Sequence, residues 1–125
     1  MSIVMSSGPT LYVDIDSTLV YPFESEKAAS TQLDHEDTIF IEGIPYRILR
    51  KNVYIVQRIA ASPGVHIVFW SQGGALWAKT VCEALMVDHL SNFYLTKPSW
   101  YLDDREDAGF FGTNTWIDAR KDWPE

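Results

Sequence analysis

The chain has 125 residues, of which 46% are hydrophobic and 22% charged, and its net charge is −7. These values are typical of a globular domain and exclude a disordered tail, a collagen and a coiled coil. No apolar run reaches the ~18 residues needed to cross a bilayer, and the first nine residues show no signal-peptide pattern. We therefore expect a single domain over residues 1–125, with no membrane partner.

The 17 acidic residues outnumber the 10 basic ones. A dedicated duplex DNA binder needs a basic face that displaces counterions, so this balance argues against bulk binding to duplex DNA. Cys82 is the single cysteine, which excludes a disulfide within the chain and fits a reducing compartment. We therefore expect a cytoplasmic location.

The apolar pattern predicts alternating strands and helices. Residues 11–16 (LYVDID) form a short strand, and residues 38–48 hold β-forming residues around Glu42-Gly43, which indicates a hairpin. Residues 52–61 carry apolar side chains at helical spacing, and residues 65–70 (VHIVFW) are almost continuously apolar, as in a strand buried on both faces.

A second helix is predicted after Gly73-Gly74. The spacing i, i+3, i+4, i+7 of a buried helical stripe is matched by Ala78, Val81, Cys82, Leu85 and His89. Strand, helix, strand, helix, strand is the order of an α/β fold with a mostly parallel central sheet.

The end of the predicted sheet poses a conflict. Residues 92–96 and residues 100–102 (WYL) both have strand character, yet only three residues separate them. Two neighbouring parallel strands need a crossover of about a dozen residues, so we interpret residues 92–96 as a short piece at a sheet edge. Residues 115–117 are a weaker strand candidate.

Polar residues follow these strands, where open α/β sheets bind their ligands. Asp14 and Asp16 close the first strand, and their i, i+2 spacing predicts that both side chains lie on one side of it. Ser71 follows VHIVFW directly. Asp103-Asp104 follow WYL, and Lys97 lies between the second and third of these clusters.

These residue types favour phosphoryl transfer to an aspartate. Two carboxylate clusters at one sheet edge repel each other unless a cation lies between them, and Mg²⁺ takes oxygen ligands. A hydroxyl beside a helix N-terminus and a lysine both suit a phosphate.

In this order the motifs resemble the haloacid dehalogenase (HAD) superfamily. The run DIDSTLV (residues 14–20) after an apolar strand is similar to its first motif, and Ser71 after an apolar strand is similar to the second. Lys97 in TKP resembles the third motif, and Asp103-Asp104 resembles the acidic fourth. The resemblance covers roughly residues 11–104 and extends to short phosphatase-like members found in phages and bacteria.

The resemblance implies a role for each residue. Asp14 would be the nucleophile that forms an aspartyl-phosphate, and Asp16 would protonate the leaving oxygen and then activate water. Ser71 and Lys97 would orient the phosphoryl group. The Asp14 carboxylate, the Asp16 main-chain carbonyl and one of Asp103 or Asp104 would bind Mg²⁺.

The implied fold is a small Rossmann-like three-layer α/β fold with a flap hairpin at about residues 37–50. The chain departs from the family in having no room for a large cap domain, so we expect an open site or one roofed by another molecule. Many members also place a helix between the lysine and the acidic motif, whereas here Asp103 follows Lys97 by six positions. The implied activity is Mg²⁺-dependent hydrolysis of a phosphomonoester: a nucleotide, a nucleic-acid terminal phosphate or a sugar phosphate.

Structural interpretations remain open beside these roles. Ser71 also suits a helix N-cap, Lys97 a solvated loop lysine, and Asp103-Asp104 a charged surface. His66, His89 and Cys82 are interpreted as structural. Packing is also the favoured interpretation of the aromatic residues that could border the site, Tyr46, Trp70, Trp77, Phe110 and Trp116.

Two other functions compete with hydrolysis. A catalytically idle ligand-binding or regulatory protein would keep the same fold and pocket. A receiver domain of two-component signalling also uses Asp, Ser/Thr, Lys and Mg²⁺, but there the acidic pair comes early and a lone phosphoacceptor aspartate follows. Here the D-x-D comes first and the adjacent acidic pair last, which counts against a receiver domain.

Overall fold

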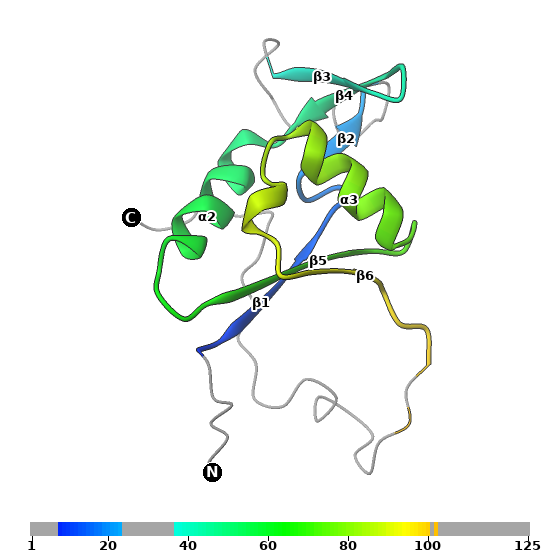
Figure 1. The fold of residues 1–125 in the computed structure, drawn as a ribbon. Helices are drawn as coiled ribbons and strands as arrows, with labels where there is room; N and C mark the ends of the chain where they lie inside the picture. Colours follow the sequence, from blue (N-terminus) through cyan, green and yellow to red (C-terminus); the bar gives the residue numbers. More distant parts are fainter. Residues whose placement is uncertain (1–7, 24–36, 101, 103–125) are drawn as a thin grey trace, which may run out of the picture.

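The computed structural model describes residues 8–23, 37–100 and 102 (Figure 1). In chain order its elements are β1 Thr10–Asp14, β2 Val20–Pro22, β3 Thr38–Ile41, β4 Ile44–Ile48, α2 Arg50–Ala60, β5 His66–Ser71, α3 Ala75–Ala84, the 3-10 helix η1 Asp88–Leu90 and β6 Phe93–Thr96. Two three-stranded sheets form from these strands, one parallel and one antiparallel. The chain is therefore a small α/β domain, as the alternation of elements predicted.

The parallel sheet has the order β1-β5-β6. Asp14 at the end of β1 pairs with Trp70 on β5, and Trp70 pairs with Leu95 on β6. The three strands therefore end at one edge, and the residues that follow them are neighbours in space. The interpretation of residues 92–96 as a short strand at a sheet edge is confirmed.

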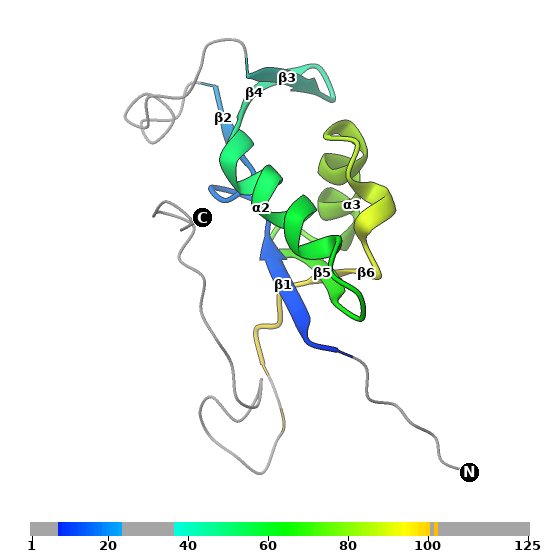
Figure 2. The same ribbon diagram turned by 90° about the vertical axis from the view of Figure 1, so that its left-hand side faces the viewer.

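Helices α2 and α3 lie on the same side of the parallel sheet (Figures 1 and 2). This follows from the strand order, because two right-handed crossovers that step in the same direction across a sheet place both helices on one face. Alternate strand residues such as Val13 and Phe69 face the helices and are buried. The core that results is continuous from β1 to α3.

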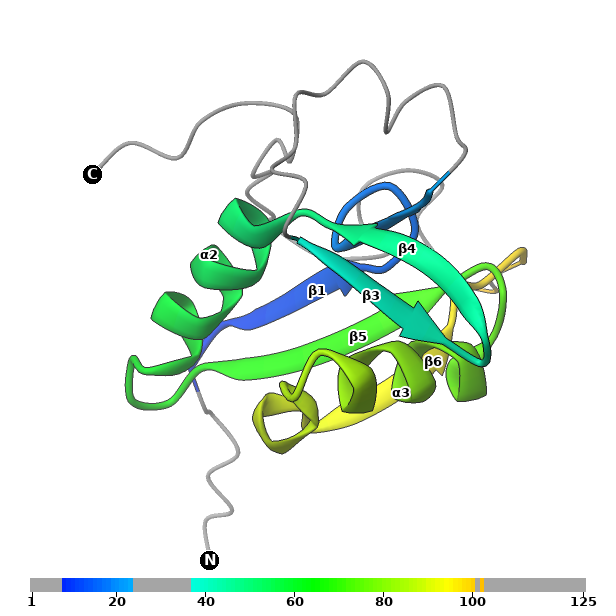
Figure 3. The same ribbon diagram turned by 90° about the horizontal axis from the view of Figure 1, so that it is seen from above.

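The antiparallel sheet has the order β2-β4-β3 and lies beyond the carboxyl end of β1, with β3 packed against α3 (Figure 3). Its hairpin turns at Glu42 and Gly43, whose φ angles of 54° and 82° suit the two-residue turn that matches strand twist. The predicted hairpin is thus confirmed. The strand β2 was not predicted, because three residues are too few to show a period.

Two element predictions need correction. Helix α3 ends at Ala84, and Met86 has a φ of 63°, so His89 lies in η1 rather than on the helical stripe. Trp100 and Leu102 are fully or almost fully exposed and belong to no strand. Because only three residues link them to β6, these residues cannot continue as its parallel neighbour. The strand candidate at residues 115–117 lies outside the described residues.

Within the described part of the chain, no helix has the length and apolar character required to cross a membrane.

Replacing Phe69 by Ala tests the core. Phe69 is 0% exposed and stacks on Tyr94, so Phe69→Ala should lower the free energy of unfolding by about 3–5 kcal/mol. Phe40→Ala is the matched control, since Phe40 is 68% exposed and should change stability little. Urea denaturation measures both; equal losses would contradict the assignment of Phe69 to the core.

The buried thiol of Cys82 gives a second test. Burial, reinforced by the charges of Asp88 and Glu83, raises the pKa of Cys82 to about 12. The folded pKa exceeds the unfolded value of about 8.5, so burial of the neutral thiol stabilises the folded state relative to high pH. This stabilisation is complete below a pH of about 8.5 and is lost as the pH rises toward 12. At pH 8 a thiol-reactive disulfide reagent should label Cys82 slowly in the native protein and rapidly in urea. Rapid labelling of the native protein would contradict the burial of the Cys82 thiol.

Candidate functional site

The turn after β1 presents two carboxylates at the carboxyl edge of the parallel sheet. Asp14 is the last residue of β1, and Asp16 lies in the turn that follows. The turn is closed by the amide of Leu19, which donates to the carbonyl of Ile15 at 2.8 Å, and Ser17 adopts a φ of 68°. Ile15 and Leu19 are buried, so apolar packing anchors the backbone that carries both carboxylates.

Both oxygens of the Asp14 carboxylate have partners. The Lys97 Nζ lies 3.0 Å from Oδ1, and the Thr18 hydroxyl donates to Oδ2 at 3.0 Å. About a third of the Asp14 side chain remains exposed. The carboxylate is therefore oriented by two donors and still reachable from solvent.

Lys97 is placed by the strand β5 as well as by β6. Its backbone amide donates to the carbonyl of Ser71 at 3.0 Å, which ties the residue after β6 to the end of β5. Its Nζ also lies 5.7 Å from the centre of the Trp70 ring, a cation–π distance. The lysine predicted from the TKP motif therefore contacts the predicted nucleophile.

Asp16 binds different partners. The Ser71 hydroxyl donates to its Oδ2 at 3.1 Å, and the Trp77 indole Nε1–H donates to its Oδ1 at 3.1 Å. Asp16 lies two residues beyond Asp14 and forms an isolated bridge with Val20. Ile15 between them is buried, whereas Asp14 is half-buried and Asp16 exposed. That both carboxylates lie on one side of the strand stays a prediction.

Ser71 is fully buried between Asp16 and the start of α3, and its hydroxyl accepts the amide of Gly73 at 2.9 Å. Its interpretation as the N-cap of α3 is wrong, since Gly74 holds that position with a φ of 113°. The first helical amide, that of Ala75, instead donates to the hydroxyl of Thr96 at 3.0 Å. The Ser71 hydroxyl therefore makes its contacts to Asp16 and to the Gly73 amide rather than to the first turn of α3.

The hairpin contributes one wall. The ring of Tyr46 on β4 lies 5.7 Å from the ring of Trp77, centre to centre. Burial raises the pKa of Tyr46, and the negative charges of Asp16 and Glu42 raise it further. The antiparallel sheet thus reaches the side of the site that holds Asp16.

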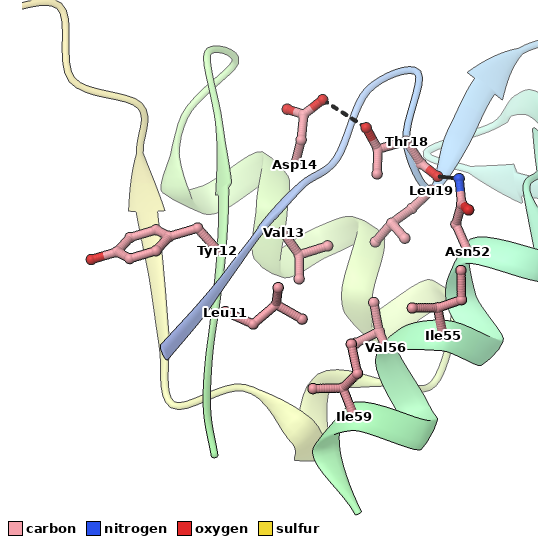
Figure 4. Close-up of a pocket in the computed structure, with 10 residues that line it drawn as sticks. All are labelled: Leu11, Tyr12, Val13, Asp14, Thr18, Leu19, Asn52, Ile55, Val56 and Ile59. Atoms are coloured by element: carbon pink, nitrogen blue, oxygen red, sulfur yellow. Dashed lines mark hydrogen bonds between the residues drawn. The ribbon is translucent and has the colours of Figure 1, made fainter. Parts of the chain in front are cut away.

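A cavity of about 210 Å³ runs between β1 and α2, with Asp14 and Thr18 toward one end and Ile59 toward the other (Figure 4). Its long wall is apolar. Asn52 on α2 is buried there, and its side-chain amide donates to the carbonyl of Thr18 at 2.9 Å. This bond fixes the turn that carries the two carboxylates against α2.

No group of three or more His, Cys, Asp or Glu residues suited to a metal occurs among residues 8–23, 37–100 and 102. The predicted acidic ligands Asp103 and Asp104 lie outside these residues, as do Phe110 and Trp116. Asp14 and Asp16 offer oxygen donors only, and this is the ligand type that Mg²⁺ takes.

The structure brings four predicted residues together as two pairs, Asp14 with Lys97 and Asp16 with Ser71. Sequence reasoning missed three further residues that support them: Thr18, Asn52 and Thr96. Thr18 had a usable signal, since it falls within the DIDSTLV run. Trp77 was named as a possible border of the site but interpreted as packing, and the structure gives it a hydrogen bond to Asp16. The contacts of Asn52, Trp77 and Thr96 span long sequence separations that periodicity does not show.

Comparison of the chain with protein-family models, with curated proteins and with solved structures found no match. The chemistry of the site must therefore be argued from its own side chains.

Removing the Thr96 hydroxyl tests how α3 is anchored at the site. Thr96→Val deprives the Ala75 amide of its acceptor, and loss of such a capping hydroxyl costs about 0.5–2 kcal/mol. Thr96→Ser keeps the hydroxyl and should retain most of the stability. Thermal and urea unfolding of the two variants provide the comparison; an unchanged Thr96→Val protein would show that the bond carries no stability.

Proposed function

We propose that the chain is a Mg²⁺-dependent phosphomonoester hydrolase of the HAD type that acts through an aspartyl-phosphate. The observation that carries this proposal is the pairing of the two carboxylates of one turn with two different phosphate-binding side chains. Lys97 contacts Asp14, and Ser71 contacts Asp16. These partners come from the ends of the other two parallel strands, so the four side chains gather at one edge of the sheet.

The first half-reaction is nucleophilic substitution at phosphorus. The exposed Asp14 carboxylate attacks, a bond forms between its oxygen and phosphorus, and the bond from phosphorus to the leaving oxygen breaks. Asp16 gives a proton to that leaving oxygen, so the alcohol departs neutral. Lys97 and Ser71 hold the phosphoryl oxygens and offset their charge.

The second half-reaction hydrolyses the intermediate. Asp16, now ionised, takes a proton from a water molecule as its oxygen attacks phosphorus. The bond between phosphorus and Asp14 breaks, which releases inorganic phosphate, restores the Asp14 carboxylate and leaves Asp16 protonated. Each side chain ends in the protonation state in which it began.

Mg²⁺ would neutralise part of the charge between the phosphoryl group and Asp14. Its ligands would be the Asp14 carboxylate, the Asp16 main-chain carbonyl and one of Asp103 or Asp104. A cation with oxygen ligands suits this set, because Lys97 offsets only one of the acidic charges gathered at the edge.

The fold supports the same proposal. We interpret the parallel sheet and its helices as a Rossmann-like core, and the β3–β4 hairpin as a flap beside an otherwise open site. A site without a large cap suits a nucleotide, a nucleic-acid terminal phosphate or a sugar phosphate. We place the protein in the cytoplasm, in keeping with its single cysteine, which is buried and free.

A phosphate-release screen with Mg²⁺ over nucleotides, sugar phosphates and phosphorylated DNA ends tests the proposal. The wild type should hydrolyse one of these classes, and EDTA should abolish the activity. Asp14→Asn should lower kcat by more than about 1,000-fold, because an amide cannot form the aspartyl-phosphate.

Asp88→Asn is the matched control, since Asp88 lies on η1 and its side chain has no part in the proposed chemistry. It should retain wild-type activity. Wild-type protein that is silent on the whole panel but binds a phosphorylated ligand would replace hydrolysis with a ligand-binding role. Full activity in Asp14→Asn would show that Asp14 is not the nucleophile.

A further inference from the structure

The acid/base candidate Asp16 is held by Trp77, for which the sequence favoured a packing role. The Trp77 indole N–H donates to Asp16 Oδ1 at 3.1 Å, and the Ser71 hydroxyl donates to Oδ2 at the same distance. Each oxygen thus has its own donor. The two donors differ in what happens to them when a phosphoryl group binds.

Ser71 cannot hold Asp16 throughout the reaction. A hydroxyl has one proton to donate, and the proposed role of Ser71 directs that proton to a phosphoryl oxygen. Once it turns to the phosphoryl group, Asp16 loses the donor on Oδ2. The indole nitrogen is a donor only, and it has no part in binding the phosphoryl group.

We propose that Trp77 is the positioning residue for Asp16, an inference that rests on the hydrolase function proposed above. The indole keeps Oδ1 fixed while Oδ2, released by Ser71, carries the transferred proton. Oδ2 gives this proton to the leaving oxygen and later takes one from the attacking water. A proton on Oδ1 would face the indole N–H, which has no lone pair to accept it, so the indole directs the proton to Oδ2.

The surroundings hold the indole in place. A Cβ atom at Gly73 would lie 3.2 Å from Trp77 Cδ1 and 3.3 Å from the Ser71 hydroxyl oxygen, so the absence of a side chain there lets both donors approach Asp16. The indole also contacts the ring of Tyr46 from the hairpin, with the ring centres 5.7 Å apart. Trp77 therefore packs against both the backbone before α3 and the antiparallel sheet.

The contact itself can be tested without activity. The chain has five tryptophans, and the indole N–H signal of Trp77 in a ¹⁵N–¹H NMR spectrum is identified by its loss in Trp77→Phe. In Asp16→Ala this signal should shift strongly, because its acceptor is gone, whereas Asp14→Ala should move it much less. A Trp77 signal that is unchanged in Asp16→Ala would overturn the inference.

The role is tested by kinetics on two leaving groups. β-Glycerophosphate expels an alkoxide that needs protonation, whereas p-nitrophenyl phosphate expels a stable phenolate that needs little. Trp77→Phe should lower kcat/KM by roughly 10- to 100-fold on β-glycerophosphate, part of the 10²–10⁴-fold that general acid–base catalysis contributes. This ratio reports the steps up to departure of the leaving group and excludes hydrolysis of the intermediate, which the two substrates share. The loss of kcat/KM on p-nitrophenyl phosphate should be less than about threefold.

Trp100→Phe is the matched control, because Trp100 is 91% exposed and the same substitution there should leave both rates unchanged. Thermal unfolding checks that Trp77→Phe is folded. An equal loss of kcat/KM on the two substrates, or none on either, would make Trp77 a packing residue and overturn the proposal while leaving the hydrolase intact. A wild-type protein that hydrolyses neither these two substrates nor any on the screening panel would instead refute the proposed hydrolase function. The positioning role of Trp77 would be refuted with it.

Discussion

Parallel pairing of β1 with β5 is the constraint on which the candidate site depends. The register sets Asp14 opposite Trp70, so Ser71 comes one residue beyond the end of β1, beside the turn that holds Asp16. Strand alternation reinforces this register, because Val13 and Phe69 must both face the helices to be buried. A slip of one residue would turn these apolar side chains away from α2 and α3. The packing that stabilises the sheet therefore also determines which polar groups meet at its edge.

Charge distribution follows from the same topology. Two carboxylates within one short turn repel each other, and the structure offsets this by giving them separate partners. Lys97 reaches Asp14 from the end of β6, while Ser71 and Trp77 reach Asp16 from β5 and α3. The bond between the Lys97 amide and the Ser71 carbonyl joins the two sets of partners through the backbone. A substitution that shifts the end of β5 or β6 would therefore shift the partners of both carboxylates.

The features that could be predicted from the sequence were those that short stretches of residues reveal on their own. The continuous apolar run of β5 and the β-forming residues around Glu42-Gly43 predicted their elements. The strand ends pointed to Asp14 and Ser71, and the resemblance of TKP to a family motif pointed to Lys97. Trp77 could only be named as a possible border of the site, and Thr96 could not be identified, because each binds a partner far away in the sequence, Asp16 and the Ala75 amide respectively. An aromatic residue on a helix is ordinarily a packing residue, and only the fold shows that this one carries a donor to a carboxylate.

Ser71 links phosphoryl binding to the hydrogen bonds of Asp16 in the proposed reaction. Without a ligand, the Ser71 hydroxyl donates to Oδ2 of Asp16 and the Trp77 indole N–H donates to Oδ1. A hydroxyl has one proton to donate, so a phosphoryl group that takes the Ser71 hydrogen bond would leave Oδ2 free for proton transfer. The indole N–H would stay on Oδ1, because an indole nitrogen only donates. The carboxylate would thus keep one fixed oxygen while the partner of the other oxygen changes.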